Sequence, residues 1–295
     1  MKRKIELLPG LSLFLCFCLL IGSGELATRF GGGVGALFAA ELASFLVPTL
    51  LLTRLSPDHK LLETMRLRPR KLPRGALGLT IKLGVTVAVL SLFLNFLVYQ
   101  IAGMTGADLT ATALNAPQTG LNAVGRILII VILSSVLEEL YLRGALFSAN
   151  EQLAGTSSCI IVSGLAFAML HGNMMNFAGP MAAGMAYAYL TYSFGSIWPA
   201  VLAHAVNNIY YLAVVWMTDT YAAFGIWDYF AAINGLLLLL FLYLTLRAAE
   251  SLLAKGYIPR FRKGGGWSDT ILLARNPGVL VFVLAFIVKA ILHWI

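Results

Sequence analysis

The chain has 295 residues, of which 59% are hydrophobic and 12% charged, and its mean hydropathy is +0.85. This composition excludes an ordinary soluble domain and indicates an integral membrane protein. The net charge of +8 does not indicate a nucleic-acid-binding face, because the basic residues collect in a few loops between apolar runs.

The apolar runs are long enough to cross about 30 Å of hydrocarbon at about 1.5 Å of helical rise per residue. They predict an all-α polytopic bundle of eight or nine transmembrane helices, forming a single integral membrane domain over 1–295 around an intramembrane chamber. The first run is long for a signal peptide, so we expect a retained helix. The expected spans are 7–26, 33–53, 76–101, 126–148, 157–172, 175–194, 197–217, 228–248 and 277–294.

Basic residues mark the expected orientation in the membrane. They precede the first span and fill the loops at 54–74 and 255–275, whereas 103–125 and 218–227 contain no Lys or Arg. With nine alternating spans every basic cluster falls on one side, and the positive-inside rule places that side and the N-terminus in the cytoplasm. The loop at 56–75 interleaves leucines with its basic residues, so it lies either at the headgroup boundary or in solvent.

Small residues recur in the span 175–194, at Gly179, Ala183, Gly184 and Ala188. This spacing lets the backbones of neighbouring helices approach closely. We therefore expect this helix inside the bundle and not at its edge.

The stretch "EELYLR" places Glu138, Glu139 and Arg143 inside an apolar run. Glu139 and Arg143 are four residues apart, so they share a helix face in the favourable acid-first order. Glu138 points about 100° away and has no counterion at helical spacing. A carboxylate without a built-in partner suits a general base that acts on water.

Three further polar residues lie within or at the end of apolar spans. Counted from the cytoplasmic ends, Glu138 lies about 15 Å deep, His171 about 20 Å, and His204 and Asn208 about 10 and 17 Å, so the four side chains can share one chamber. His204 and Asn208 stack on one face of "HAVNN", where both can donate to a developing oxyanion. Single polar groups at such depth often only hold helices together, but four such groups indicate a functional site.

Glu41, in "FAAELASF", is another acid near the middle of the membrane. It belongs to no recognisable pattern. A structural pair with a basic residue of a neighbouring helix and a role in the site remain equally open.

Three short motifs resemble those of the intramembrane CAAX protease and bacteriocin-processing family, also called CPBP or Abi proteins. They occur in the family's order and spacing, over about 130–210, and define a catalytic core at 126–212. The motifs are Glu-Glu-x-x-x-Arg at Glu138, Glu139 and Arg143, Phe-x-x-x-His at Phe167 and His171, and His-x-x-x-Asn at His204 and Asn208.

The resemblance implies a metal-independent glutamic endopeptidase without a cofactor, in the inner membrane of a bacterium. Glu138, with His171, would activate a water that attacks a peptide carbonyl, and His204 and Asn208 would hold the oxyanion. Glu139 and Arg143 would position the first glutamate, with Phe167 in support. The expected partners are the lipid bilayer and a membrane-associated protein or peptide substrate, which would reach the chamber from the cytoplasmic side.

Three other readings stay open. Two histidines and a glutamate can hold a catalytic zinc ion, although the chain contains no His-Glu-x-x-His. The same ionisable residues can form the relay of a proton-coupled transporter, although no internal repeat is visible. A non-catalytic membrane scaffold is the third alternative, because a family fold does not by itself prove turnover.

Overall fold

The computed structural model describes residues 2–30, 33–56, 61–104, 121–174, 176–221, 226–259 and 266–294, and no strand occurs among them. The α-helices are α1 (Lys2–Phe30), α2 (Val34–Glu41), α3 (Val47–Leu55), α4 (Leu61–Thr64), α5 (Ala76–Met104), α6 (Leu121–Leu128), α7 (Ser135–Glu139), α8 (Phe147–Glu151), α9 (Thr156–Leu170), α10 (Ala178–Phe194), α11 (Trp198–Tyr221), α12 (Ile226–Ala254), α13 (Trp267–Ala274) and α14 (Pro277–Trp294). Three π-helical segments interrupt them: η1 (Leu42–Leu46), η2 (Ile129–Ser134) and η3 (Leu140–Leu146).

The expected all-α polytopic membrane bundle is confirmed, but the expected eight or nine spans are not. Within the described residues, five helices are long and apolar enough to cross a bilayer: Leu7–Leu26, Val34–Leu55, Ala76–Val98, Trp198–Met217 and Tyr229–Ala254. A sixth span results only if α13 and α14, which are bent by 75° against each other, are counted as one.

The three remaining spans expected from the sequence, at 126–148, 157–172 and 175–194, are realised differently. Helices α9 and α10 have 15 and 17 residues, fewer than the roughly 20 that a spanning helix needs. Residues 121–151 form one helical stretch, but η2 and η3 divide it into short α-helical pieces. These three segments make the middle of the bundle.

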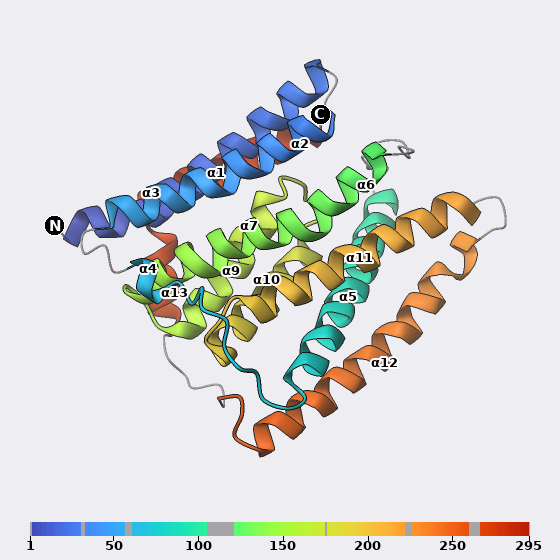
Figure 1. Cartoon of the computed structure of the whole chain (residues 1–295). Helices are drawn as coiled ribbons and strands as arrows, with labels where there is room; N and C mark the ends of the chain where they lie inside the picture. The colour runs from blue at the N-terminus through green and yellow to red at the C-terminus, as the bar shows by residue number, and fades with distance from the viewer. Residues whose placement is uncertain are drawn as a thin grey trace.

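Figure 1 shows α1, α2 and α3 along one side of the molecule and α5, α11 and α12 along the other, with α7, α9 and α10 between them. Helices α1 and α14 pack against each other in parallel, with the Phe17 and Phe282 ring centroids 5.4 Å apart. Their backbones approach most closely at two glycines, since a Cβ on Gly10 would lie 2.4 Å from the backbone nitrogen of Val279. Small residues thus bring the C-terminal helix onto the first one.

The small-residue face of α10 lies inside the bundle, as its spacing predicts. Gly179, Ala183, Gly184 and Ala188 are all buried. A Cβ on Gly184 would lie 2.9 Å from the Cα of Gly164 in α9, so the two backbones are nearly in contact. This close approach is what the prediction required.

Loops that are far apart in the sequence meet at one end of the bundle. The amide of Ile197, before α11, donates to the carbonyl of Arg66 at 3.1 Å, and the amide of Gly155, before α9, donates to Asp269 of α13 at 2.9 Å. We call this end the basic face, made of residues 61–75, 152–155, 195–197 and 255–259. Alternating spans require these loops to share one side. The expected loop at 105–120 and the basic residues of 260–263 lie outside the described residues.

The segment 61–75 is anchored to the core by apolar side chains, while most of its charged residues are exposed. Leu61 and Met65 are buried in the core with exposures of 1% and 0%, and the indole of Trp198 donates to the carbonyl of Leu67 at 2.8 Å. This segment is therefore a packed part of the basic face.

Candidate active site

Glu139 forms a closed cluster with Arg143 and His204. Its Oε1 accepts from Arg143 Nη1 at 2.8 Å and is 3.0 Å from Nδ1 of His204. Glu139 and Arg143 are fully buried, and His204 is 3% exposed. The predicted pair of Glu139 and Arg143 is therefore present, and its partner His204 comes from a helix 65 residues later.

Aromatic rings cover this cluster. The Arg143 guanidinium lies 4.8 Å from the Phe167 ring centroid and 5.4 Å from that of Tyr187. The His204 ring stacks on Tyr187 at 5.2 Å, with an interplanar angle of 19°, and meets Phe167 edge-on. Cation–π contacts and the ion pair together offset the desolvation of the guanidinium, which has no access to water.

Gly184 makes room for the cluster on the α10 side. Arg143 Nη2 donates to its carbonyl at 2.9 Å, and a Cβ at this position would lie 3.1 Å from the same nitrogen. A side chain here would push the guanidinium away from the carbonyl or part α9 from α10. The glycine is thus required by the close approach of three elements.

The π-helical segments surround the site. Glu138 and Glu139 end α7, which lies between η2 and η3, and Arg143 lies within η3. Glu41 ends α2, directly before η1. A π turn inserts an extra residue and turns the helix faces that follow it, which is why such turns are frequent at functional sites.

Glu138 faces a cavity instead of the closed cluster. The cavity has a volume of about 290 Å³, and the hydroxyl of Ser134, one turn earlier, donates to Glu138 Oε1. Its lining combines four ionisable side chains with apolar ones. The lining residues are Glu41, Glu138, His171 and Lys289, with Leu20, Ile21, Phe45, Phe167, Leu170 and Gly172.

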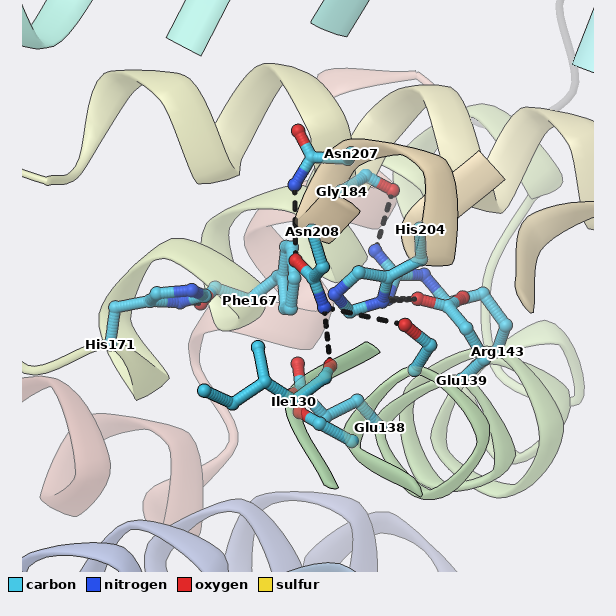
Figure 2. A network of polar contacts seen from close by, with 12 residues as sticks. Ile130, Glu138, Glu139, Arg143, Phe167, His171, Gly184, His204, Asn207 and Asn208 are labelled. Carbon is cyan, nitrogen blue, oxygen red and sulfur yellow. Dashed lines mark hydrogen bonds and ion pairs between the residues drawn. The ribbon is translucent and has the colours of Figure 1, made fainter. Parts of the chain in front are cut away.

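His171 ends α9 at the cavity and is exposed. Its Nδ1 lies 2.7 Å from the Phe167 carbonyl, so Nδ1 carries the proton and the neutral ring presents Nε2 as an acceptor. The next residue, Gly172, has φ of +64°, a left-handed conformation that ends the helix. Figure 2 shows His171 set apart from the cluster of Glu139, with Phe167 between them.

Asn208 lies beside the cluster on α11, and its amide hydrogens have partners. Nδ2 donates to the carbonyl of Ile130 at 2.8 Å and more weakly to Ser135 Oγ at 3.3 Å. Its Oδ1 accepts from Asn207 at 3.3 Å (Figure 2). In this state Asn208 ties α11 to the π segment η2.

The structure therefore divides the predicted residues into two groups. Glu139, Arg143 and His204 form the closed cluster, and Glu138 and His171 line the cavity. Phe167 contacts both groups, because its ring meets His171 and His204 at 4.8 and 5.5 Å. Asn208 lies next to the closed cluster and does not line the cavity.

The cavity lies far from the basic face. Measured from the helix ends at that face, with about 1.5 Å per residue, each ionisable lining residue lies about 20 Å away. Access to the chamber from the cytoplasmic side stays a prediction.

Sequence reasoning missed several residues at the site. No sequence pattern includes Lys289, and none decides between a structural and a functional role for Glu41, yet both line the cavity. Tyr187 and Ser134 contact Arg143 and Glu138. A signal existed for two of them, since Glu41 and Lys289 are charged residues within apolar spans.

Metal-binding geometry is not found in the part of the chain that the structure describes. There, no group of three or more His, Cys, Asp or Glu side chains is placed to hold an ion. The zinc alternative thus has no preformed ligand set among these residues.

Comparison with known proteins supports the motifs. Neither curated proteins nor solved structures include a match to this chain. One family model does match, over residues 120–210, about a third of the chain, and it is described as type II CAAX prenyl endopeptidase Rce1-like. The matched segment contains Glu138, Glu139, Arg143 and both predicted histidines. This segment of an integral membrane protein thus carries the signature of the Rce1-like CAAX proteases, as its motifs had indicated.

Proposed function

We propose that the protein is an intramembrane endopeptidase in which Glu138 and His171 activate the hydrolytic water. The observation that carries this proposal is their shared cavity, from which the neighbouring Glu139 is excluded. A carboxylate and an imidazole acceptor that face one space can hold a water between them. The segment's match to a protease family supplies the reaction class.

The hydrolytic step follows from these groups. Glu138 takes a proton from water while the water oxygen bonds to the substrate's carbonyl carbon, and the carbonyl electron pair moves to its oxygen. When the tetrahedral intermediate collapses, the C–N bond breaks and the amine leaves with the proton from Glu138. His171 Nε2 accepts a hydrogen bond from the same water and orients it.

The oxyanion role proposed for His204 needs a particular protonation state. Its Nδ1–H faces the Glu139 carboxylate, so Nε2 donates to an oxyanion only in the imidazolium form. Asn208 contributes a donor only after it gives up the longer of its bonds, the one to Ser135. Both roles therefore require a small rearrangement when substrate binds.

The substrate is a membrane-associated protein or peptide, and the family's name points to the region near a C-terminus that follows a lipidated cysteine. We place the N-terminus and the basic face in the cytoplasm, as the positive-inside rule requires. The cavity then lies in the outer half of the bilayer, and the cleaved bond must reach that half. Labelling of single cysteines at Leu20 and Ile21 by an impermeant thiol reagent tests the side, because reaction only from the cytoplasm would contradict it.

The reaction is tested with purified wild type and Glu138→Gln in liposomes, using a library of lipidated and unlipidated peptides and mass spectrometry. Glutamine keeps the shape of the side chain and removes the base, so cleavage should fall by about 10²–10⁴-fold. Equal cleavage by both proteins would reject Glu138 as the base. Failure of the wild type to cleave any peptide would count against the protease itself.

A chelator arm separates the glutamate mechanism from zinc catalysis. We propose a metal-independent reaction, so cleavage by wild type should survive prolonged treatment with a strong chelator. Loss of cleavage on chelation, with recovery on addition of zinc, would assign the reaction to a metal.

A further inference from the structure

Glu41 lines the cavity but belongs to none of the three family motifs. It comes from the second apolar span, about 80 residues before the matched segment, and lines the same cavity as Glu138. Its Oε2 is buried and has no hydrogen-bond partner in the described parts of the chain. None of the ion pairs formed there includes Glu41, so the structural pair left open by the sequence is not formed.

Ser134 lies between the two carboxyl groups in the electrostatics of the cavity. Its hydroxyl donates to Glu138 and is close enough to act on the Glu41 carboxyl, whose Oε2 has no hydrogen-bond partner in the described parts of the chain. A hydroxyl has one hydrogen to donate, so while it donates to one carboxylate it can only accept from the other group. Hydrogen bonds between Ser134 and both groups can therefore form at the same time when Glu41 carries a proton and Glu138 does not, or the reverse.

We propose that Glu41 and Glu138 are an acid–base pair that shares one proton through Ser134, with Glu41 as a second catalytic acid of the cavity. The inference rests on the peptidase reaction proposed above. It adds to that reaction a residue outside the family segment. Two carboxyl groups in one confined site hold a single proton between them in other hydrolases as well, because two adjacent negative charges repel each other.

The groups that face this pair come from every element around the cavity. His171 of α9 and Lys289 of α14 line it, and Cys16 of α1 lies close enough to interact electrostatically with both glutamates. Lys289 runs along Gly172, since its Cε would be 3.1 Å from a Cβ there. Lys289 forms no ion pair within the described residues. When Glu41 and Glu138 hold one proton between them, the negative charge of the other carboxylate is balanced by the ammonium group of Lys289.

The pair gives the reaction a closed proton cycle. Glu138 takes a proton from the attacking water, as in the reaction above. The leaving nitrogen takes its proton from Glu41, in place of Glu138, as the C–N bond breaks. The proton on Glu138 then passes to the Ser134 hydroxyl, whose hydrogen passes to Glu41. The pair ends as it began, with one water consumed and one peptide bond replaced by an acid and an amine.

The test compares Glu41→Gln with wild type in the peptide assay. Glutamine can still bond to Ser134 but cannot release a proton, so kcat should fall by about 10²–10⁴-fold while KM stays within about twofold. Glu63→Gln, on the exposed face of α4, is the matched control and should leave both constants unchanged. A Glu41→Gln protein that keeps kcat within about threefold of wild type would overturn the proposal.

Infrared spectroscopy gives a readout that does not depend on finding the substrate. The carbonyl stretch of a protonated carboxyl should be present in wild type at neutral pH and absent in Glu41→Gln. An unchanged band in this variant would overturn the shared proton even if the wild type is an active protease. Loss of the band in a protein that cleaves nothing would support the pair and count against the peptidase function instead.

Discussion

Around Glu139 the bundle is closed: an arginine and a histidine bind one carboxylate oxygen, two aromatic rings cover them, and a glycine carbonyl accepts a second hydrogen bond from the guanidinium. Around Glu138, one residue earlier, the bundle is open, and the carboxyl group shares a cavity with Glu41, His171 and Lys289. The two residues have the same chemistry and nearly the same depth. Their surroundings differ because a rotation of about 100° along the helix turns them toward different neighbours.

This contrast shows how a membrane protein can place one reactive carboxylate accurately. The closed cluster joins η3, α9, α10 and α11 at Arg143, Phe167, Gly184 and His204. Because Glu139 cannot rotate without breaking these contacts, its covalent connection to Glu138, together with the hydrogen bond from Ser134, holds Glu138 in its direction. With such preorganisation, the free energy needed to orient the carboxylate is spent during folding and not during the reaction.

The largest effect should follow from breaking the closed side. Arg143→Met leaves Glu139 as an uncompensated buried charge, which should lower the free energy of unfolding by about 3–5 kcal/mol and abolish cleavage. Arg247→Met removes an exposed pair with Glu250 of the same residue types and should cost less than about 0.5 kcal/mol. Thermal unfolding in detergent measures both, and equal losses would show that the cluster is not a special support.

Removal of the charge of Glu138, on the open side, should lower activity strongly and stability little. Glu138→Gln should reduce turnover by about 10²–10⁴-fold and change the free energy of unfolding by less than about 0.5 kcal/mol, since no ion pair is broken. Unfolding and cleavage are measured on the same preparation. A strong loss of stability in this variant would mean that Glu138 is a second structural acid, and the contrast with Glu139 would disappear.

A side chain at the wall between α9 and α10 should disturb the closed cluster moderately. In Gly184→Ala the new Cβ meets the Gly164 backbone, which cannot move aside, so the loss of stability should be about 1–3 kcal/mol. Gly235→Ala, in α12, is the control, because a Cβ there has no neighbour within 4 Å and alanine favours the helix. Equal stability of the two variants would refute the close approach of the three elements.

The smallest effect is expected at the end of α9. Gly172→Ala forces an L-residue into φ of +64°, which should cost about 1–2 kcal/mol and displace His171, so cleavage should also decline. Gly256→Ala has nearly the same φ, +69°, with open space around it, and should show the same cost without any loss of cleavage. If both variants cleave normally, the position of His171 does not depend on this turn.

The local part of the site could be predicted from the sequence. Glu139 and Arg143 are four residues apart on one helix, and their pairing follows from helical spacing alone. The small residues of α10 likewise predicted a buried helix, since their spacing marks one face. In both cases the residues of the pattern lie within one continuous helical stretch, so their separation in the sequence determines which of them share a face.

The cavity could not be predicted in the same way. Glu41 and Glu138 are 97 residues apart, and Lys289 belongs to a helix whose partner α1 is at the other end of the chain. The π segments add a second difficulty, because a helix wheel with 3.6 residues per turn loses its phase at each of them. Counting apolar residues predicted eight or nine spans, of which the described residues show five or six by length and composition, because the count ignores where a helix ends inside the bundle.

The short length of α9 has a consequence for the bilayer itself. With 15 residues the helix extends about 22 Å from the basic face, less than the hydrocarbon thickness, and it ends in the polar residues His171, Gly172 and Asn173. Such a hydrophobic mismatch is relieved by local thinning of the membrane and by entry of water above the helix end. In the hydrolysis proposed above, this thinning brings the second reactant, water, to a depth at which an undisturbed bilayer holds none.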